Sequence, residues 1–134
     1  IGSFSIDDPI ARDPRNRVKM RVADVGREAL SHVSLKNFYQ GYSHISIDIE
    51  TGRTHQIRVH LSHKKLPIIG DRLYNPRNLI AKNTPESLTT TIQNFSRQAL
   101  HASKLKFPSI KGEKFFEFQS VLPEDIQSLI NIMK

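Results

Sequence analysis

Apolar and polar residues alternate along several short stretches of the chain, and this period of two is typical of β-strands that bury one face. The clearest stretch is residues 43–50, in which Ile45, Ile47 and Ile49 are expected to share the buried face. Residues 17–22 alternate in the same way, with cationic side chains on the opposite face. Further strands are predicted at residues 29–36, 104–107 and 115–118, and the last two are expected to form an antiparallel hairpin.

Three other stretches have the period and the boundary residues of helices. After Thr51-Gly52 breaks the strand, Thr54 is a suitable N-cap for a helix that begins at His55 and is ended by Pro67. A second helix is predicted from Thr84-Pro85 and a third from Pro123, the third with an apolar stripe that docks on the sheet (Ile126, Leu129, Ile130 and Met133). The pattern predicts an α+β fold, a mainly antiparallel mixed sheet with about three packed helices, in a single domain over residues 1–134.

Composition narrows the class of protein. The chain has 134 residues, 37% of them hydrophobic and 25% charged, which is ordinary for a globular domain. It has no cysteine, which excludes disulfides, thiolate metal sites and cysteine nucleophiles. No apolar run approaches the roughly 18 residues of a membrane span, and no signal-peptide core is present at the start, so a cytoplasmic protein is expected. Because the first residue is Ile1, we also expect a piece of a longer protein.

The chain carries a net charge of +7, which suits a polyanionic partner such as nucleic acid, but simple solubility explains the charge equally well, and the distribution of the cations has to decide. The cations are concentrated in the basic segment, residues 12–21, whose only acid is Asp13. This segment predicts contacts with a nucleic-acid backbone, although a solvated sheet face remains the alternative. The basic segment contributes Arg12, Arg15, Arg17 and Lys19 as candidate RNA contacts.

An aromatic loop is expected at residues 37–42, where Phe38, Tyr39 and Tyr42 either stack on bases or close the end of a sheet.

The strand, glycine turn and helix at residues 43–64 suggest an anion site, because Arg53 and the free N–H groups of the first helical turn meet there. At 100° per residue, Ile57 and Leu61 face the core and Arg58 lies at the edge of the buried side. An unmatched buried cation is costly, so Arg58 requires a carboxylate or phosphate held in a bidentate way.

A metal site is not expected at the three histidines of this helix. His55, His60 and His63 are separated by five and three residues, whereas zinc-binding helices place histidines four apart, and no carboxylate lies among them. We interpret His55 as an anion or RNA contact and the other two as hydrogen-bonded structural residues. No serine has a G-x-S-x-G setting. The residues alone therefore predict a basic anion-binding domain with an incomplete catalytic set, and a histidine metallo-hydrolase is the least favoured alternative.

Three motifs stand in order along the chain. The central motif is T-G-R-T-H-Q-I-R-V-H-L-S-H at residues 51–63, followed by P-I-I-G-D-R-L-Y at 67–74. Upstream of it lies P-I-A-R-D-P at residues 9–14, with R-V-K-M at 17–20, and downstream lies R-Q-A-L-H-A at residues 97–102. Together these motifs resemble the RluA-type family of RNA pseudouridine synthases, and most closely its D-type members, which modify large-subunit ribosomal RNA. Leu66 and Ser109 stand where many members have histidine or histidine-proline, which weakens the subfamily assignment.

The resemblance implies a cofactor-free isomerisation of uridine to pseudouridine in a flipped-out nucleotide. The family's catalytic aspartate lies in a His-Arg-Leu-Asp motif that this sequence lacks, so we expect the C-terminal part of a catalytic domain that is inactive alone. By position, Arg58 matches the arginine that pairs with that aspartate, and Leu100 the apolar residue that shapes the uracil pocket. Arg53, His55 and Gln56 are expected beside the RNA.

The sequence leaves an alternative function, and the fragment hypothesis implies an exposed surface. A non-catalytic, basic RNA-binding module is the alternative to an enzyme. If the chain is a fragment, an apolar patch or sheet edge should be exposed, and self-association should follow.

Overall fold

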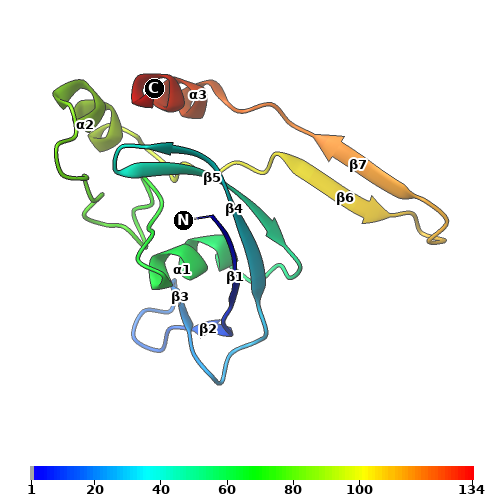
Figure 1. Ribbon diagram of the computed structural model, residues 1–134. Coiled ribbons are helices and arrows are strands. Elements are labelled where there is room, and N and C mark those ends of the chain that lie inside the picture. The colour runs from blue at the N-terminus through cyan, green and yellow to red at the C-terminus, as the bar shows by residue number, and fades with distance from the viewer. Residues whose placement is uncertain (1) are drawn as a thin grey trace.

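The computed structural model describes residues 2–134, which form three small antiparallel sheets and three helices (Figure 1). The predicted α+β class is confirmed, but the single expected sheet is divided into three. The elements in chain order are β1 (Ser3–Asp7), β2 (Ile10–Arg12), β3 (Met20–Val22), β4 (Leu30–Tyr39), β5 (Tyr42–Ile49), α1 (Gln56–His63), α2 (Glu86–Gln93), β6 (Lys104–Pro108), β7 (Phe115–Gln119) and α3 (Glu124–Met133).

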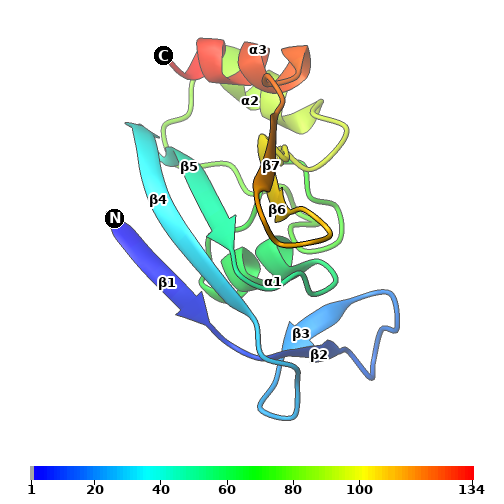
Figure 2. The same ribbon diagram turned by 90° about the vertical axis from the view of Figure 1, so that its right-hand side faces the viewer.

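The largest sheet has the order β1-β4-β5, and α1 lies beside it (Figure 2). Ile6, Val33 and Leu61 form the buried core between this sheet and the helix, with Ile45 and Ile47 packed against them. The strand predicted at residues 43–50 is therefore confirmed as β5. Ile49 is the exception: it is the last residue of β5, lies outside this core and is 47% exposed.

The helix of the central motif begins later and ends earlier than the sequence suggested. It begins at Gln56, and its N-cap is His55 in the left-handed region (φ 55°), so the prediction of Thr54 as N-cap was wrong. The Gln56 Oε1 accepts hydrogen bonds from the Arg53 N–H and the Thr51 hydroxyl, and this side chain closes the turn instead. The helix ends at His63, well before Pro67.

Two strand boundaries also differ from the sequence prediction. The strand expected from residue 17 begins only at Met20, because Asn16 makes a turn whose carbonyl accepts the Lys19 N–H at 2.9 Å, and Val18 is 64% exposed there. The loop expected at residues 37–42 is instead the end of a long hairpin. β4 continues to Tyr39 and β5 starts at Tyr42, with Gly41 in the turn at φ 83°.

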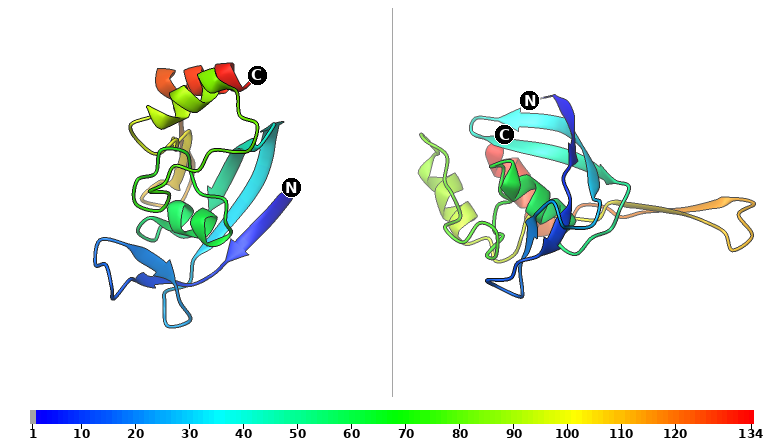
Figure 3. Two further views of the ribbon diagram at one scale, coloured as in Figure 1. Left: turned by 90° about the vertical axis from the view of Figure 1, so that its left-hand side faces the viewer. Right: turned by 90° about the horizontal axis from the view of Figure 1, so that it is seen from below.

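The last helix was expected on the sheet, but α3 packs against α2. Leu88, Ile92 and Leu129 form a separate core there, because the stripes of two amphipathic helices cover one another (Figure 2). α2 begins one residue later than expected, at Glu86, and Pro85 takes the N-cap position. The hairpin of β6 and β7 is confirmed, and it extends away from the rest of the molecule (Figure 3). Within residues 2–134, no helix has the length and apolarity needed to cross a membrane.

Candidate active site

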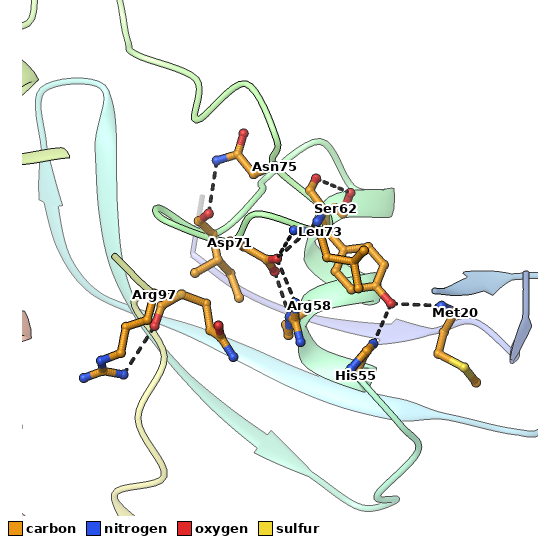
Figure 4. A network of polar contacts seen from close by, with 11 residues as sticks. Met20, His55, Arg58, Ser62, Asp71, Leu73, Asn75 and Arg97 are labelled. Carbon is orange, nitrogen blue, oxygen red and sulfur yellow. Dashed lines mark hydrogen bonds and ion pairs between the residues drawn. The ribbon is translucent and has the colours of Figure 1, made fainter. Parts of the chain in front are cut away.

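The central feature of the motif is a bidentate ion pair between Arg58 and Asp71 (Figure 4). Arg58 Nε donates to Asp71 Oδ2 and Nη2 donates to Oδ1, both at 2.9 Å. The Asp71 side chain is fully buried and that of Arg58 is 15% exposed. The carboxylate that the helical position of Arg58 required is therefore supplied within this chain, by a residue to which the sequence analysis had assigned no role.

Asp71 is held in place by its own turn, residues 68–74. Its Oδ1 also accepts the backbone N–H groups of Leu73 and Tyr74, each at 3.1 Å. Asn75 braces the turn by donating from Nδ2 to the carbonyl of Ile68 at 3.1 Å. Burial would raise the pKa of the Asp71 carboxyl, but the hydrogen bonds from Arg58 and from the two N–H groups outweigh it and leave the pKa below its ordinary value. The carboxylate is therefore ionised, and it fixes the direction of the guanidinium.

The Arg58 guanidinium keeps one free edge. Asp71 occupies Nε and Nη2, and within residues 2–134 Nη1 has no hydrogen-bond partner. The face of the group lies against the Tyr74 ring, with Cζ 5.1 Å from the ring centroid. The hydrogen bonds to Asp71 raise the pKa of Arg58, so it stays charged. This geometry leaves a fixed cation whose Nη1 can donate to a second anion.

Tyr74 connects this ion pair to the start of α1 and to β3. Its hydroxyl accepts the Met20 N–H at 2.9 Å and lies 2.8 Å from His55 Nδ1 (Figure 4). A hydroxyl that accepts from Met20 has its own hydrogen available for a neutral imidazole nitrogen. Burial, followed by the nearby charge of Arg58, lowers the pKa of His55 and favours this neutral form. Tyr74 was not predicted as a site residue from the sequence; the only local signal was the turn pair Gly70-Asp71 that precedes it.

The other two predicted residues of the motif, Arg53 and Gln56, both make hydrogen bonds that support the turn before α1. Arg53 is half-buried, and its Nε donates to the Glu28 carbonyl at 2.7 Å. Gln56 is 3% exposed, and its Nε2 donates to Leu30 O and Ser31 Oγ. The structure thus gives Gln56 a positioning role within the turn, and its predicted contact with RNA stays a prediction.

The basic segment approaches the same site from the β2–β3 hairpin. The Lys19 ammonium lies over the Tyr74 ring, 5.3 Å from its centroid. The Arg12 Nη1 donates to the Arg17 carbonyl at 2.7 Å, which ties the two sides of the hairpin together. Arg15 and Arg17 are exposed in the connection between the strands. Lys19, over the Tyr74 ring, and Arg12, whose charge acts on His55, therefore border the site, and Arg15 and Arg17 add exposed cations in the connection.

The segment that contains Leu100 lies against the turn of Asp71. Ala99 donates its N–H to the Ile69 carbonyl at 2.8 Å, and Leu100 is half-buried. A Cβ placed on Gly70 would lie 2.0 Å from the Arg97 carbonyl oxygen, so only glycine fits between the two segments. Residues 97–100 and 69–71, far apart in sequence, are thus brought into contact.

The remaining histidines behave differently from one another. His60 is fully buried; its Nδ1 lies 2.8 Å from Ser31 Oγ and its Nε2 2.9 Å from the Asp8 carbonyl, as expected of a structural residue. His63 was expected to be hydrogen-bonded, but it is exposed at the last residue of α1 and makes no such bond to the described residues. No group of three or more potential metal ligands occurs within residues 2–134.

Ser5, His32 and Glu50 form a hydrogen-bonded line across the outer face of the largest sheet. His32 Nδ1 lies 2.7 Å from Ser5 Oγ, and its Nε2 lies 2.5 Å from Glu50 Oε2. In a serine-hydrolase triad the Nε2 faces the serine, so the ring here has the opposite orientation. The His32 and Glu50 side chains are also 41% and 61% exposed, so these contacts are cross-strand hydrogen bonds on the sheet surface and not a catalytic triad.

The arrangement of sheets and helices is that of a pseudouridine synthase fold. Residues 3–63 match the family model described as RNA pseudouridylate synthase. The structure aligns with Human RNA Pseudouridylate Synthase Domain Containing 4 at a TM-score of 0.70 and 21% identity, covering 98% of this chain and 56% of that one. Human RNA Pseudouridylate Synthase Domain Containing 1 aligns at a TM-score of 0.67 and 20% identity, covering 99% and 60%.

Sequence relatives give the same family. Ribosomal large subunit pseudouridine synthase D of Xanthomonas campestris pv. campestris is 41% identical over 135 residues, which is 100% of this chain and 40% of that protein. The protein of the same name in Escherichia coli (strain K12) is 36% identical over 131 residues, 97% of this chain and 40% of that protein. This chain belongs to the RluA-type RNA pseudouridine synthase family. It spans about 40% of the length of the curated relatives that it matches.

Proposed function

We propose that residues 1–134 are the C-terminal portion of a pseudouridine synthase catalytic domain that isomerises uridine to pseudouridine in large-subunit ribosomal RNA. Family membership and the names of the relatives support the reaction and the substrate class. The proposed site needs no cofactor, and its setting would be the cytoplasm. The partner is RNA, and neither a metal nor a membrane takes part.

The observation that carries the proposal is the half-occupied guanidinium of Arg58. Asp71 holds Nε and Nη2, which leaves Nη1 for a second carboxylate. We assign that position to the nucleophilic aspartate of the family, supplied from outside residues 1–134. A fixed cation within hydrogen-bond distance would lower the pKa of this aspartate and keep it ionised for attack.

The RNA would lie across the surface between the basic segment and the start of α1. Arg53 and His55, with Arg12, Arg15, Arg17 and Lys19, are assigned to RNA contacts, and Gln56 acts beside them by holding the turn. Leu100 is assigned to the uracil pocket, because its segment lies against the turn of Asp71. Cations and polar groups gathered along one path are typical of phosphate contacts, which position an RNA without reading its sequence.

The test is pseudouridine formation on ribosomal RNA fragments by a completed domain that contains this chain. Arg58→Ala should lower turnover by at least about a hundredfold, since one charge-stabilising group is lost, and should change RNA affinity by less than about tenfold. Arg77→Ala, at an exposed cation without a role in the site, is the control and should keep the wild-type rate. An unchanged rate in Arg58→Ala would refute the assigned role.

The isolated chain gives a second, independent test. It should bind ribosomal RNA fragments but form no pseudouridine, because the aspartate is missing. Turnover by residues 1–134 alone would contradict the proposal. A completed domain that binds RNA without turnover would instead support the non-catalytic RNA-binding module.

A further inference from the structure

His55 has a backbone conformation that is unfavourable for its residue type. Its φ of 55° and ψ of 23° lie in the left-handed region, which a side chain of this size seldom adopts. Its carbonyl nevertheless accepts the Val59 N–H at 2.9 Å and so begins α1. Residues held in this region by the structure around them cluster at functional sites. The conformation fixes where the imidazole points, at the border of the proposed site.

The hydroxyl of Tyr74 decides which nitrogen of His55 carries the hydrogen. It accepts the Met20 N–H at 2.9 Å and lies 2.8 Å from His55 Nδ1 (Figure 4). The two rings meet edge to face, with centroids 5.6 Å apart and an interplanar angle of 79°. Within residues 2–134 the hydroxyl has no other hydrogen-bond partner, so its own hydrogen is satisfied only by Nδ1. An accepting Nδ1 leaves the hydrogen of the neutral ring on Nε2.

The Nε2 atom of His55 is open to solvent. It makes no hydrogen bond within residues 2–134, and the only buried side-chain atom without a partner in that range is Asp8 Oδ2. Burial, followed by the charge of Arg58, lowers the pKa of His55 below its ordinary value, and Arg12 adds to this effect while Asp71 opposes it. The ring therefore offers a neutral N–H donor among cations.

We propose that His55 binds RNA by donating its Nε2 hydrogen to an oxygen acceptor of the nucleic acid, and that Tyr74 is the positioning residue that keeps this hydrogen on Nε2. This inference rests on the proposed function, to which it adds the donor atom and the residue behind it. The acceptor is a phosphate oxygen or a uracil carbonyl oxygen. Unpaired RNA exposes both, and each accepts a neutral N–H without a proton transfer.

A fixed donor contributes something that the surrounding cations do not. Arg12 and Lys19 attract phosphates over a range of directions, and this attraction weakens with salt. A neutral N–H held in one direction adds no charge, but it is satisfied only by an oxygen that lies in line with it. His55 therefore sets the register of the RNA against α1. Protonation removes this function, because a hydrogen on Nδ1 would face the hydrogen of the Tyr74 hydroxyl.

The tautomer is measured on this chain by NMR correlation of the imidazole nitrogens with the ring protons in neutral buffer. We expect a single tautomer of His55, with an accepting Nδ1 and the hydrogen on Nε2. Tyr74→Phe keeps the ring beside Arg58 and Lys19 but removes the hydroxyl, and it should shift the nitrogen signals towards a mixture of tautomers. A hydrogen on Nδ1 in the unaltered chain, or nitrogen signals that Tyr74→Phe leaves unchanged, would overturn the inference.

The RNA contact is measured with a short single-stranded oligouridylate, whose addition should move the Nε2 signal of His55. An abasic oligonucleotide of the same length distinguishes the two acceptors. It moves the same signal if the acceptor is a phosphate oxygen and leaves it in place if the acceptor is a uracil carbonyl. A signal that the oligouridylate does not move would overturn the inference.

His55→Asn tests the donor without disturbing its surroundings. Asparagine tolerates the left-handed region, and its Oδ1 takes the place of Nδ1 as an acceptor for the Tyr74 hydroxyl, but nothing replaces Nε2. The affinity for the oligouridylate should fall by about tenfold, while the melting temperature hardly changes. His63→Asn, at the exposed far end of α1, is the matched control and should change the affinity by less than about twofold.

The outcomes separate this inference from the proposed function. Equal affinities of His55→Asn and His63→Asn would overturn the inference, and if the completed domain still forms pseudouridine, the proposed function stands without it. If the His55 contact is observed but the completed domain forms no pseudouridine, the inference stands and the proposed function fails.

Discussion

Replacing Asp71 by asparagine should destabilise the chain strongly, because it removes the charge that matches a buried cation. The Asp71→Asn side chain would keep one oxygen for the N–H groups of Leu73 and Tyr74, but it would place an amide NH₂ opposite Arg58 Nε, which is also a donor. Loss of one partner of a buried pair costs about 3–5 kcal/mol, and the 15% exposure of Arg58 favours the lower end, about 3 kcal/mol. Domains of this size have about 5–15 kcal/mol in all.

Urea unfolding followed by circular dichroism measures the effect. With an m-value of about 1.5 kcal/mol/M, a loss of about 3 kcal/mol lowers the midpoint by about 2 M. The control is Asp125→Asn. Asp125 binds Arg97 in the same bidentate geometry at the same 2.9 Å distances, but the two side chains are 46% and 40% exposed, and the midpoint should hardly change. Equal shifts in the two variants would refute the argument from burial.

A double variant and the pH dependence test the same reasoning further. Arg58→Gln combined with Asp71→Asn should be less destabilised than the sum of the single changes, because no charge is left unpaired. The pKa of Asp71 is lowered in the folded state, so its contribution is present above the ordinary carboxyl pKa of about 4 and is lost as the pH falls through the folded pKa. The gap between wild type and Asp71→Asn should therefore narrow in acid. A gap that stays constant down to about pH 2 would contradict the assigned ionisation.

Three smaller predictions concern the supports of the site. The pKa of His55, followed by NMR, should lie below its ordinary value of about 6.5 because of burial and the charge of Arg58. Arg58→Gln should therefore raise this pKa. Since the folded state favours the neutral ring, protonation of His55 should lower the free energy of unfolding as the pH falls below about 6.5. Gln56→Leu leaves the Leu30 carbonyl and the Arg53 N–H without this partner and should lower the free energy of unfolding by about 2–3 kcal/mol in thermal melts, whereas a loss under about 0.5 kcal/mol would show that water replaces the amide. Gly70→Ala, with φ 78° and a Cβ 2.0 Å from a carbonyl oxygen, should cost clearly more than about 2 kcal/mol. Gly112→Ala, with φ 71° and open space, should cost only the backbone strain of about 1–2 kcal/mol, and similar costs for the two variants would exclude the clash as the cause.

Where the sequence prediction of the fold failed, a contact between distant residues decided the structure. The N-cap of α1 was expected at Thr54 from residue type, but the amide of Gln56, bound to β4 at Leu30 and Ser31, set the turn. The stripe of α3 was recognised, and its partner was not, because amphipathicity specifies that a face is buried without specifying what covers it.

The sequence by itself determined the α+β class, the strand, turn and helix of the central motif, and the need of Arg58 for a bidentate anion. Each follows from local periodicity or from the cost of burying a charge. Only the tertiary structure showed that Asp71 supplies this anion, because the two residues are thirteen positions apart in the sequence with a glycine turn between them. It also showed that Asp71 takes two of the three nitrogens of Arg58. The motif by itself indicated a cation near a turn. The structure shows that Asp71 holds this cation, Arg58, in a fixed direction and leaves its Nη1 for a second partner.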